Sequence, residues 1–208
     1  MNEKMKEDTK EKILNTVVEI IGKEGVHVIT VRKVADLSQV NIAAINYYFG
    51  SKDDLIEEAI QYFLERKMLE IVSILDMPEY KVDQKLFLFL KNYMEVISHY
   101  PGFPKSILAS VLKGDLSFFK KINNFINKVI MKIASLIAEN LDIQDMEIAL
   151  IKTIQIIIPV VFPISLHNAF SNLFPLDLHD EAIKEKYIKV ILESILKLEI
   201  KDLDNLNE

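Results

Sequence analysis

The sequence contains no cysteine and very little glycine or proline. Without cysteine, its 208 residues cannot form disulfides, zinc–thiolate sites or a thiol nucleophile. The spacing of the five glycines excludes a P-loop, a dinucleotide-binding glycine motif and a nucleophile elbow. Five glycines and six prolines also leave few sharp turns. With 50% hydrophobic and 27% charged residues, these shortages predict a globular, all-α fold.

The sequence also lacks a signal peptide and a long uncharged apolar segment. Residues Met1 to Lys12 are polar, which is not typical of a secretory leader. The longest uncharged apolar run, residues 156–168, is about half the length that spans a bilayer. We therefore expect a cytoplasmic protein with no membrane partner.

Charge is unevenly distributed along the chain, whose formal net charge is −6. Residues 1–52 hold eight basic and seven acidic side chains, whereas residues 53–208 hold 17 and 24. A near-neutral head on an acidic body permits DNA binding by the head without requiring it.

Hydrophobic periodicity, capping residues and helix breakers predict about nine helices and no confident strand. Pro159 and Pro163 fall inside one of these helices and should kink it. Val26 to Ile29 could form a short strand, but an extended connector is the preferred interpretation because no partner strand is near. The expected helices cover residues 9–23, 31–37, 41–48, 53–75, 82–98, 104–112, 116–140, 145–171 and 179–200.

The second and third expected helices are separated by a four-residue turn, as in a helix-turn-helix. On the third helix, apolar residues recur at three- and four-residue spacing and form one face. The opposite face is polar, aromatic and uncharged. Asparagine can bond adenine in two places, and small apolar side chains can touch a thymine methyl group. The alternative is a small three-helix core with a merely solvated outer face. The outer face holds Asn41, Ile42, Ala43, Asn46 and Tyr47.

Residues Thr30–Ala35 and Val40–Leu55 resemble the DNA-binding region of TetR-family transcriptional regulators. The family's aromatic tripeptide ending in Phe, followed by a Ser-Lys pair, reads Tyr47-Tyr48-Phe49-Gly50-Ser51-Lys52 here. The resemblance covers roughly residues 10–62. One departure is Gln39, which stands where the family usually has glycine in the turn.

The resemblance implies a helix-turn-helix DNA-binding domain over residues 1–52 and an effector-binding and dimerisation domain over residues 53–208. It further implies a ligand-responsive regulator, most often a repressor, that binds a palindromic operator in double-stranded DNA as a homodimer. Contacts to phosphates are implied for Thr30, Val31, Tyr47 and Lys52, and contacts to bases for Asn41, Ile42, Ala43 and Asn46.

In the second domain, most aromatic and aliphatic side chains belong to an ordinary helix-bundle core, and some of them can line an effector pocket. An apolar or aromatic effector is expected because no buried cluster of charge is visible. The candidate lining residues are Tyr93, Met94, Ile97, Phe103, Ile107, Phe119, Ile122 and Phe162.

Two long C-terminal helices carry broad apolar stripes that one chain's core is not expected to cover entirely. Paired across a two-fold axis, they would form a four-helix bundle between two copies. The alternative is that both helices are buried within one chain. The candidate interface residues are Ile151, Ile154, Ile158, Val161, Tyr187, Ile191 and Ile195.

An enzyme, or a helical small-molecule-binding protein with an autoregulatory DNA-binding head, is the second hypothesis. It would need a catalytic acid–base pair in the second domain, and the sequence singles out none. The four histidines show no metal-ligand spacing, and capping explains His179 at a helix start better than metal binding does. We expect no cofactor, no metal and no catalytic residue.

Overall fold

A computed structural model describes residues 3–196, and all regular secondary structure in that range is helical. The all-α expectation is confirmed. The three short elements are a 3₁₀ turn at Val26–Val28, a π-helical turn at Leu64–Met68 and a 3₁₀ turn at Ile74–Asp76. The α-helices are Glu3–Glu24 (α1), Val31–Ser38 (α2), Ile42–Phe49 (α3), Lys52–Phe63 (α4), Leu69–Ser73 (α5), Val82–His99 (α6), Gly102–Leu112 (α7), Ser117–Leu141 (α8), Met146–Ser165 (α9), His167–Leu173 (α10) and Glu181–Leu196 (α11).

Three expected elements differ from the structure. The helix expected over residues 53–75 is interrupted by the π turn, which no proline or glycine announces. The helix expected over residues 145–171 is divided at Leu166, three residues after the second of its two prolines. The expected connector at Val26 is a 3₁₀ turn instead, because Gly25 at φ 92° bends the chain there. Residues 197–200 of the last expected helix lie outside the described residues.

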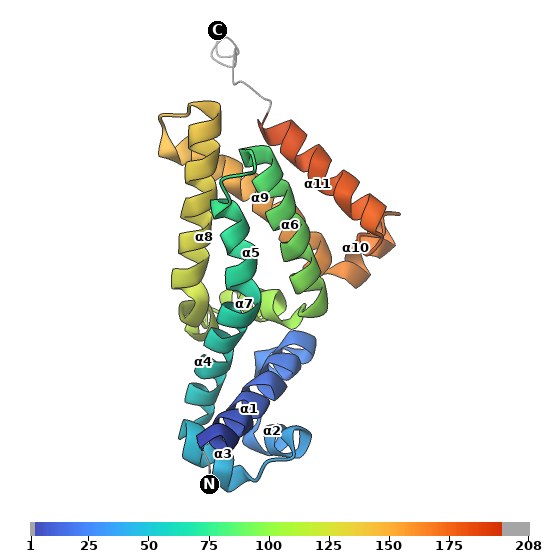
Figure 1. Cartoon of the computed structure of the whole chain (residues 1–208). Coiled ribbons are helices and arrows are strands. Elements are labelled where there is room, and N and C mark those ends of the chain that lie inside the picture. The colour runs from blue at the N-terminus through green and yellow to red at the C-terminus, as the bar shows by residue number, and fades with distance from the viewer. Residues whose placement is uncertain (1–2, 197–208) are drawn as a thin grey trace.

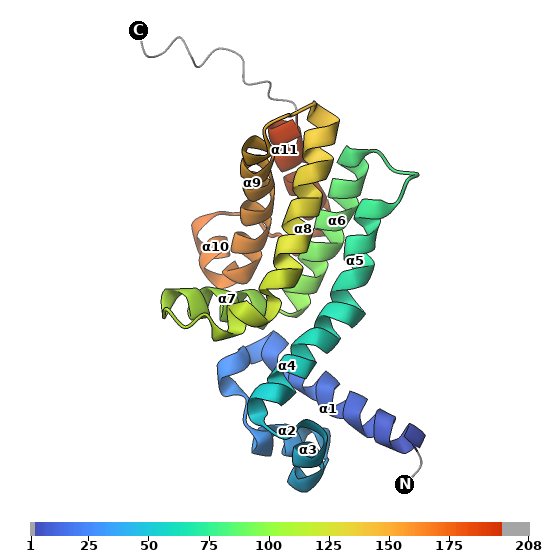
Figure 2. The same cartoon turned by 90° about the vertical axis from the view of Figure 1, so that its left-hand side faces the viewer.

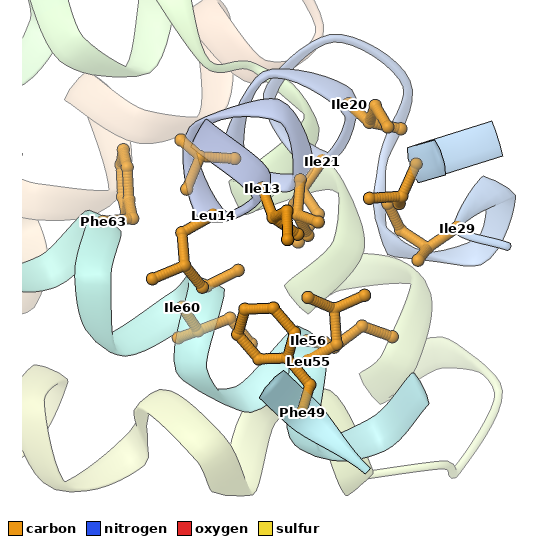
Figure 3. Packing of buried hydrophobic residues seen from close by; sticks show 14 of the residues in the cluster. Ile13, Leu14, Ile20, Ile21, Ile29, Phe49, Leu55, Ile56, Ile60 and Phe63 are labelled. Atoms are coloured by element: carbon orange, nitrogen blue, oxygen red, sulfur yellow. The ribbon is translucent and has the colours of Figure 1, made fainter. Parts of the chain in front are cut away.

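The head is built around α1, as Figure 3 shows. Ile13, Val17 and Ile21 of α1 are fully buried, and α2, α3 and α4 all contribute to the same hydrophobic cluster. Leu55 and Ile60 of α4 are also fully buried in that cluster. The first three turns of α4 therefore pack with the head, beyond the expected domain boundary after residue 52.

The body is a bundle in which α8 packs on α9, and α6 packs on both α9 and α11. Helix α7 lies across the lower end of this bundle, where the body meets the head (Figures 1 and 2). The π turn lies at the boundary between two cores. Met68 belongs to the cluster of the head, and Ile71 belongs to the cluster of the body.

Among the described residues, α9 is the one helix long and apolar enough to span a membrane by length and composition. It meets that criterion, contrary to expectation, because Glu147 and Lys152 are the two charged residues along its 20 residues. In the bundle one side of α9 packs against α6, α8 and α11, and its other side is exposed.

A side chain from α11 bonds a carbonyl that a proline inside α9 leaves without its helical donor. Because Pro163 has no N–H, the carbonyl of Pro159 loses its helical donor. The Tyr187 hydroxyl donates to that carbonyl at 2.8 Å. Burial raises the pKa of Tyr187, so the hydroxyl keeps the proton that it donates. The two C-terminal helices are thus joined at the point where proline weakens one of them.

We predict that Tyr187→Phe destabilises the protein by about 1–3 kcal/mol, because it leaves a part-buried carbonyl without a donor. Chemical denaturation followed by circular dichroism would measure the loss. Tyr80→Phe, at a tyrosine that is 37% exposed, is the control and should change the free energy of unfolding by less than about 0.5 kcal/mol. Equal stability of both variants would contradict the role given to Tyr187.

Candidate DNA-binding site

Helix α2 begins at a capping threonine. The Thr30 side chain accepts a hydrogen bond from the backbone N–H of Lys33 at 3.1 Å, which fixes the first turn. Thr30 itself is exposed, and Val31 beside it is half-buried. The start of α2 is therefore rigid and open to solvent.

The turn between α2 and α3 is set by Gln39, which takes the left-handed conformation at φ 54° and ψ 38°. This conformation favours glycine and costs about 1 kcal/mol or more for other residues. Asn41 then begins α3, and its side-chain oxygen accepts a hydrogen bond from the N–H of Ala43 at 2.8 Å. The left-handed turn and the Asn41 cap together fix how α3 leaves α2.

Helix α3 presents the two faces that its sequence predicts. Ile45 and Phe49 are buried against the head core. Tyr47 is 71% exposed and Ile42 is 40% exposed. The outward face is thus uncharged and built of short side chains with one projecting phenol. The exposed residues on it are Asn41, Ile42, Ala43, Asn46 and Tyr47.

Helix α3 is held in place by α1 and α4. The ammonium of Lys10 lies 5.6 Å from the centroid of the Phe49 ring and 2.6 Å from a carboxylate oxygen of Glu58. The hydroxyl of Ser51 caps α4 by accepting from the N–H of Asp54, and Lys52 follows as the first helical residue. An exposed lysine therefore stands at the end of α3. All eight expected DNA contacts lie at the α2 start, along α3 or at the α4 start.

Tyr48 is an exception to the good hydrogen bonding of this region. It lies half-buried beside Tyr47, with ring centroids 5.4 Å apart in an edge-on arrangement. Its hydroxyl is buried and has no hydrogen-bond partner among the described residues. The ring of this tyrosine stabilises the head by packing, whereas its buried hydroxyl without a partner lowers the free energy of unfolding.

A second candidate site is an apolar cavity of about 130 Å³ where α4, α6, α7 and α8 meet. None of the described lining residues is charged, and burial raises the pKa of Tyr93 to about 12. The Tyr100 hydroxyl donates to Glu19 at 3.2 Å. The lining consists of Phe63, Leu64, Met68, Phe89, Tyr93, Ile97, Tyr100, Phe103, Pro104, Ile107, Ile122, Phe125, Ile126, Val129, Ile130 and Ile157.

Five expected lining residues, Tyr93, Ile97, Phe103, Ile107 and Ile122, lie on this cavity, and three lie elsewhere. Met94 follows Tyr93 and points into the body core, where it is fully buried. Phe119 lies one position beyond Phe118, whose ring is the one that packs inward near Phe103. Phe162 is 54% exposed on the outer face of α9.

Sequence reasoning missed the lining contributed by α4 and the π turn. Phe63, Leu64 and Met68 line the cavity, although all the expected lining residues lie further along the chain, from Tyr93 to Phe162. The ring of Phe63 stacks on Phe103 with centroids 4.0 Å apart and planes 12° apart. The sequence did offer one signal for this part of the lining, which is the aromatic residue Phe63 at the end of a helix that leads from one core to the other.

The outer face of α9 is apolar and uncovered. Ile151, Ile154 and Ile158 are 54%, 55% and 56% exposed, and Phe162 continues the row. The other four expected interface residues are partly buried and pack on the body core; these are Val161, Tyr187, Ile191 and Ile195.

Comparison with known proteins agrees with this arrangement. The family model for bacterial regulatory proteins of the tetR family matches residues 13–59. A probable HTH-type transcriptional regulator, YttP of Bacillus subtilis (strain 168), is 38% identical over 61 residues. That match covers 29% of this chain and spans 30% of the length of YttP.

Solved structures show the same fold over nearly the whole chain. A TetR transcriptional regulator from Legionella pneumophila superimposes with a TM-score of 0.71 and 20% identity, covering 89% of this chain and 96% of its own. The fatty acid degradation regulator FadR from Bacillus halodurans gives 0.67 and 15%, covering 91% and 95%. At these identities the likeness establishes the fold alone.

We predict that Tyr48→Phe stabilises the protein by up to about 1 kcal/mol, because it removes a buried hydroxyl without a partner. The matched control is Tyr62→Phe, which removes a hydroxyl that donates to Glu11 at 2.8 Å and should cost about 0.5–1.5 kcal/mol. Urea unfolding of both variants measures whether each substitution raises or lowers the free energy of unfolding. A destabilised Tyr48→Phe would mean that its hydroxyl has a partner after all.

Proposed function

We propose that this chain, which belongs to the tetR family of bacterial regulatory proteins, is a dimeric repressor that leaves its operator when a small apolar molecule fills its cavity. It would act in the cytoplasm on double-stranded DNA. The observation that carries the proposal is the exposed, uncharged face of α3, flanked by the capped starts of α2 and α4.

The α3 face suits a major groove for three reasons. Its side chains are short enough for the helix to approach the base edges closely. Asn46 offers an amide that can pair with adenine, and Ile42 offers an apolar contact for a thymine methyl group. Tyr47 and Lys52 stand at its edges, where hydroxyl and ammonium groups meet phosphates.

The cavity favours a small, neutral and largely apolar effector. An engineered protein cavity of about 150 Å³ takes up benzene, so a cavity of about 130 Å³ is close to the size that one small ring or a short alkyl chain needs. A charged ligand would lose its hydration and meet no opposite charge in this lining. The Tyr93 hydroxyl supplies one polar contact.

Dimerisation is supported by the uncovered face of α9. Four large apolar side chains, all more than half exposed and spaced along one helix face, are costly in water. A second copy placed across a two-fold axis would cover the same face on both chains at once. It would also hold two α3 helices at a fixed separation, which a palindromic operator requires.

We predict that Asn46→Ala weakens binding to the preferred sequence by about 1–3 kcal/mol, which is roughly 5- to 150-fold, and relaxes selectivity at one base pair. Lys52→Ala should weaken all sequences about equally and lower the salt slope by about one. Selection from random duplexes followed by titration would provide the preferred sequence and both affinities. Asn127→Ala, on α8, is the exposed control and should bind like the parent. If Asn46→Ala and Lys52→Ala also bind like the parent, the α3 face is not the DNA-binding surface.

We predict that Ile154→Glu combined with Ile158→Glu converts the dimer to a monomer, because four carboxylates would meet at the two-fold axis without partners. Sedimentation velocity at micromolar concentration would measure the mass. Leu69→Glu, at a 52% exposed leucine of α5, is the control and should remain dimeric. A monomeric parent chain would refute the proposed interface.

A further inference from the structure

The head and the body are joined by a contact between α4 and α8, where Lys121 pairs with Glu57, and in two further places. The first is the chain itself, which passes from α4 through the π turn into α5. The second is a packed contact between the end of α1 and the start of α7 (Figure 2). A signal from the cavity could reach α3 by either connection.

A connection that carries a movement from the cavity to α3 has to be stiff. The α4 connection instead contains the π-helical turn Leu64–Met68. At the π turn, the N–H of Leu69 bonds the carbonyl of Leu64 five residues earlier. Such turns are rare inside α-helices and are frequently found at functional sites. Phe63, Leu64 and Met68 line the cavity there, so a shift can be absorbed locally before it travels along α4.

The α1–α7 contact is tight because Gly102 at the start of α7 lies against the backbone at the end of α1. A side-chain carbon on Gly102 would collide with the carbonyl oxygen of Ile21 and would approach the carbonyl of Gly22 to 2.8 Å. A side-chain carbon on Gly22 would collide with the Tyr100 ring. At Gly102 the two backbones therefore touch directly, and the Tyr100 ring packs on Gly22 beside them.

A hydrogen bond adds resistance to separation. The N–H of Val26, just after α1, donates to the hydroxyl oxygen of Ser106 at 3.0 Å, and that hydroxyl donates to the carbonyl of Gly102 at 2.6 Å. Steric contact transmits only a push, whereas this bond also transmits a pull. It engages backbone on the head side, so a change of rotamer there cannot relax it.

The start of α7 is also a wall of the cavity. Phe103, Pro104 and Ile107 line it, while Gly102 and Ser106 of the same turns face the head. A molecule that displaces the Phe103 ring would press on α7 at the turn that faces the head. Because α1 also packs on α2, movement of the α1 end tilts the helix-turn-helix.

We propose that Ser106 is the positioning residue that couples the cavity to the DNA-binding face, by tying α7 to the backbone that follows α1. The proposal rests on the proposed function, since it assumes that an occupant of the cavity alters DNA binding. Ser106 touches neither DNA nor the occupant; it makes the head follow α7.

The test compares the parent chain with Ser106→Ala, and with Ser110→Ala as a matched control. Ser110 is also a buried serine of α7, but its hydroxyl donates to the carbonyl of Asp115, away from the head. Indole is the probe, because the chain has no tryptophan and indole emission can be read directly. Operator affinity is measured for each chain with and without saturating indole. The readout is the ratio of these two affinities, which a merely structural loss would leave unchanged.

We expect indole to change operator affinity by about 5- to 150-fold in the parent and in Ser110→Ala. In Ser106→Ala the ratio should fall below about 3-fold, while indole still binds. An unchanged ratio in Ser106→Ala would overturn this proposal and leave the proposed function standing.

Val129→Phe provides an occupant that cannot dissociate, since Val129 lines the cavity from α8. It should block indole binding and shift operator affinity in the same direction as indole, and adding Ser106→Ala should remove the shift. If neither indole nor Val129→Phe alters operator affinity, cavity control of DNA binding is wrong, and the role of Ser106 is wrong with it. This outcome differs from the one in which indole still changes the operator affinity of Ser106→Ala, because that outcome contradicts only the role of Ser106.

Discussion

The close approach of α1 to α7 is the constraint on which the arrangement of this protein depends. Gly102 allows the two backbones to touch, Gly22 makes room for the Tyr100 ring beside them, and the Ser106 hydroxyl bonds the backbone that follows α1. On its other sides α1 packs against α2 and α4. Helix α1 therefore forms the core of the head and also makes the contact with the body. Its buried residues Ile13, Val17 and Ile21 hold the helix in the position that both functions need.

Much of the head could be predicted from sequence, because its signals are local. The Thr30 and Asn41 caps, the glycine break at Gly50 and the three- and four-residue spacing of α3 each act within one or two turns. Together, these local signals predict the helix-turn-helix and its outer face. The conformation of Gln39 is the local exception, since the turn geometry prevailed over the residue's own preference.

The cavity could be predicted only in part, because its position depends on contacts between distant segments. Helical periodicity indicates which residues point inward, but it does not distinguish a core from a cavity wall. Tyr93 and Met94 are neighbours on inward faces, and the packing of α4 against α7 decides that one lines the cavity while the other is core. The π turn has no sequence signal, since no proline or glycine marks it.

Ion pairs hold α11 so that the apolar face of α9 stays uncovered. Lys184 is buried between α6 and α11 and bonds Glu95 and Glu181 at 2.8 and 2.9 Å. Lys91 of α6 pairs with Glu181 and Glu185, and its ammonium is the main cause that keeps the pKa values of both carboxyls below their usual range. Groups with depressed pKa values stabilise the fold above their usual range and lose that contribution as the pH falls through the folded-state values.

The same ion pairs fix which side of the body is left for a partner. Helix α11 is tied to α6 by charge and to α9 by Tyr187, and in this position it leaves the isoleucine row of α9 exposed. A chain that could cover this row by itself would gain stability as a monomer. Here the polar ties that orient α11 also leave the apolar face of α9 exposed, and this is the face that we propose a second copy covers.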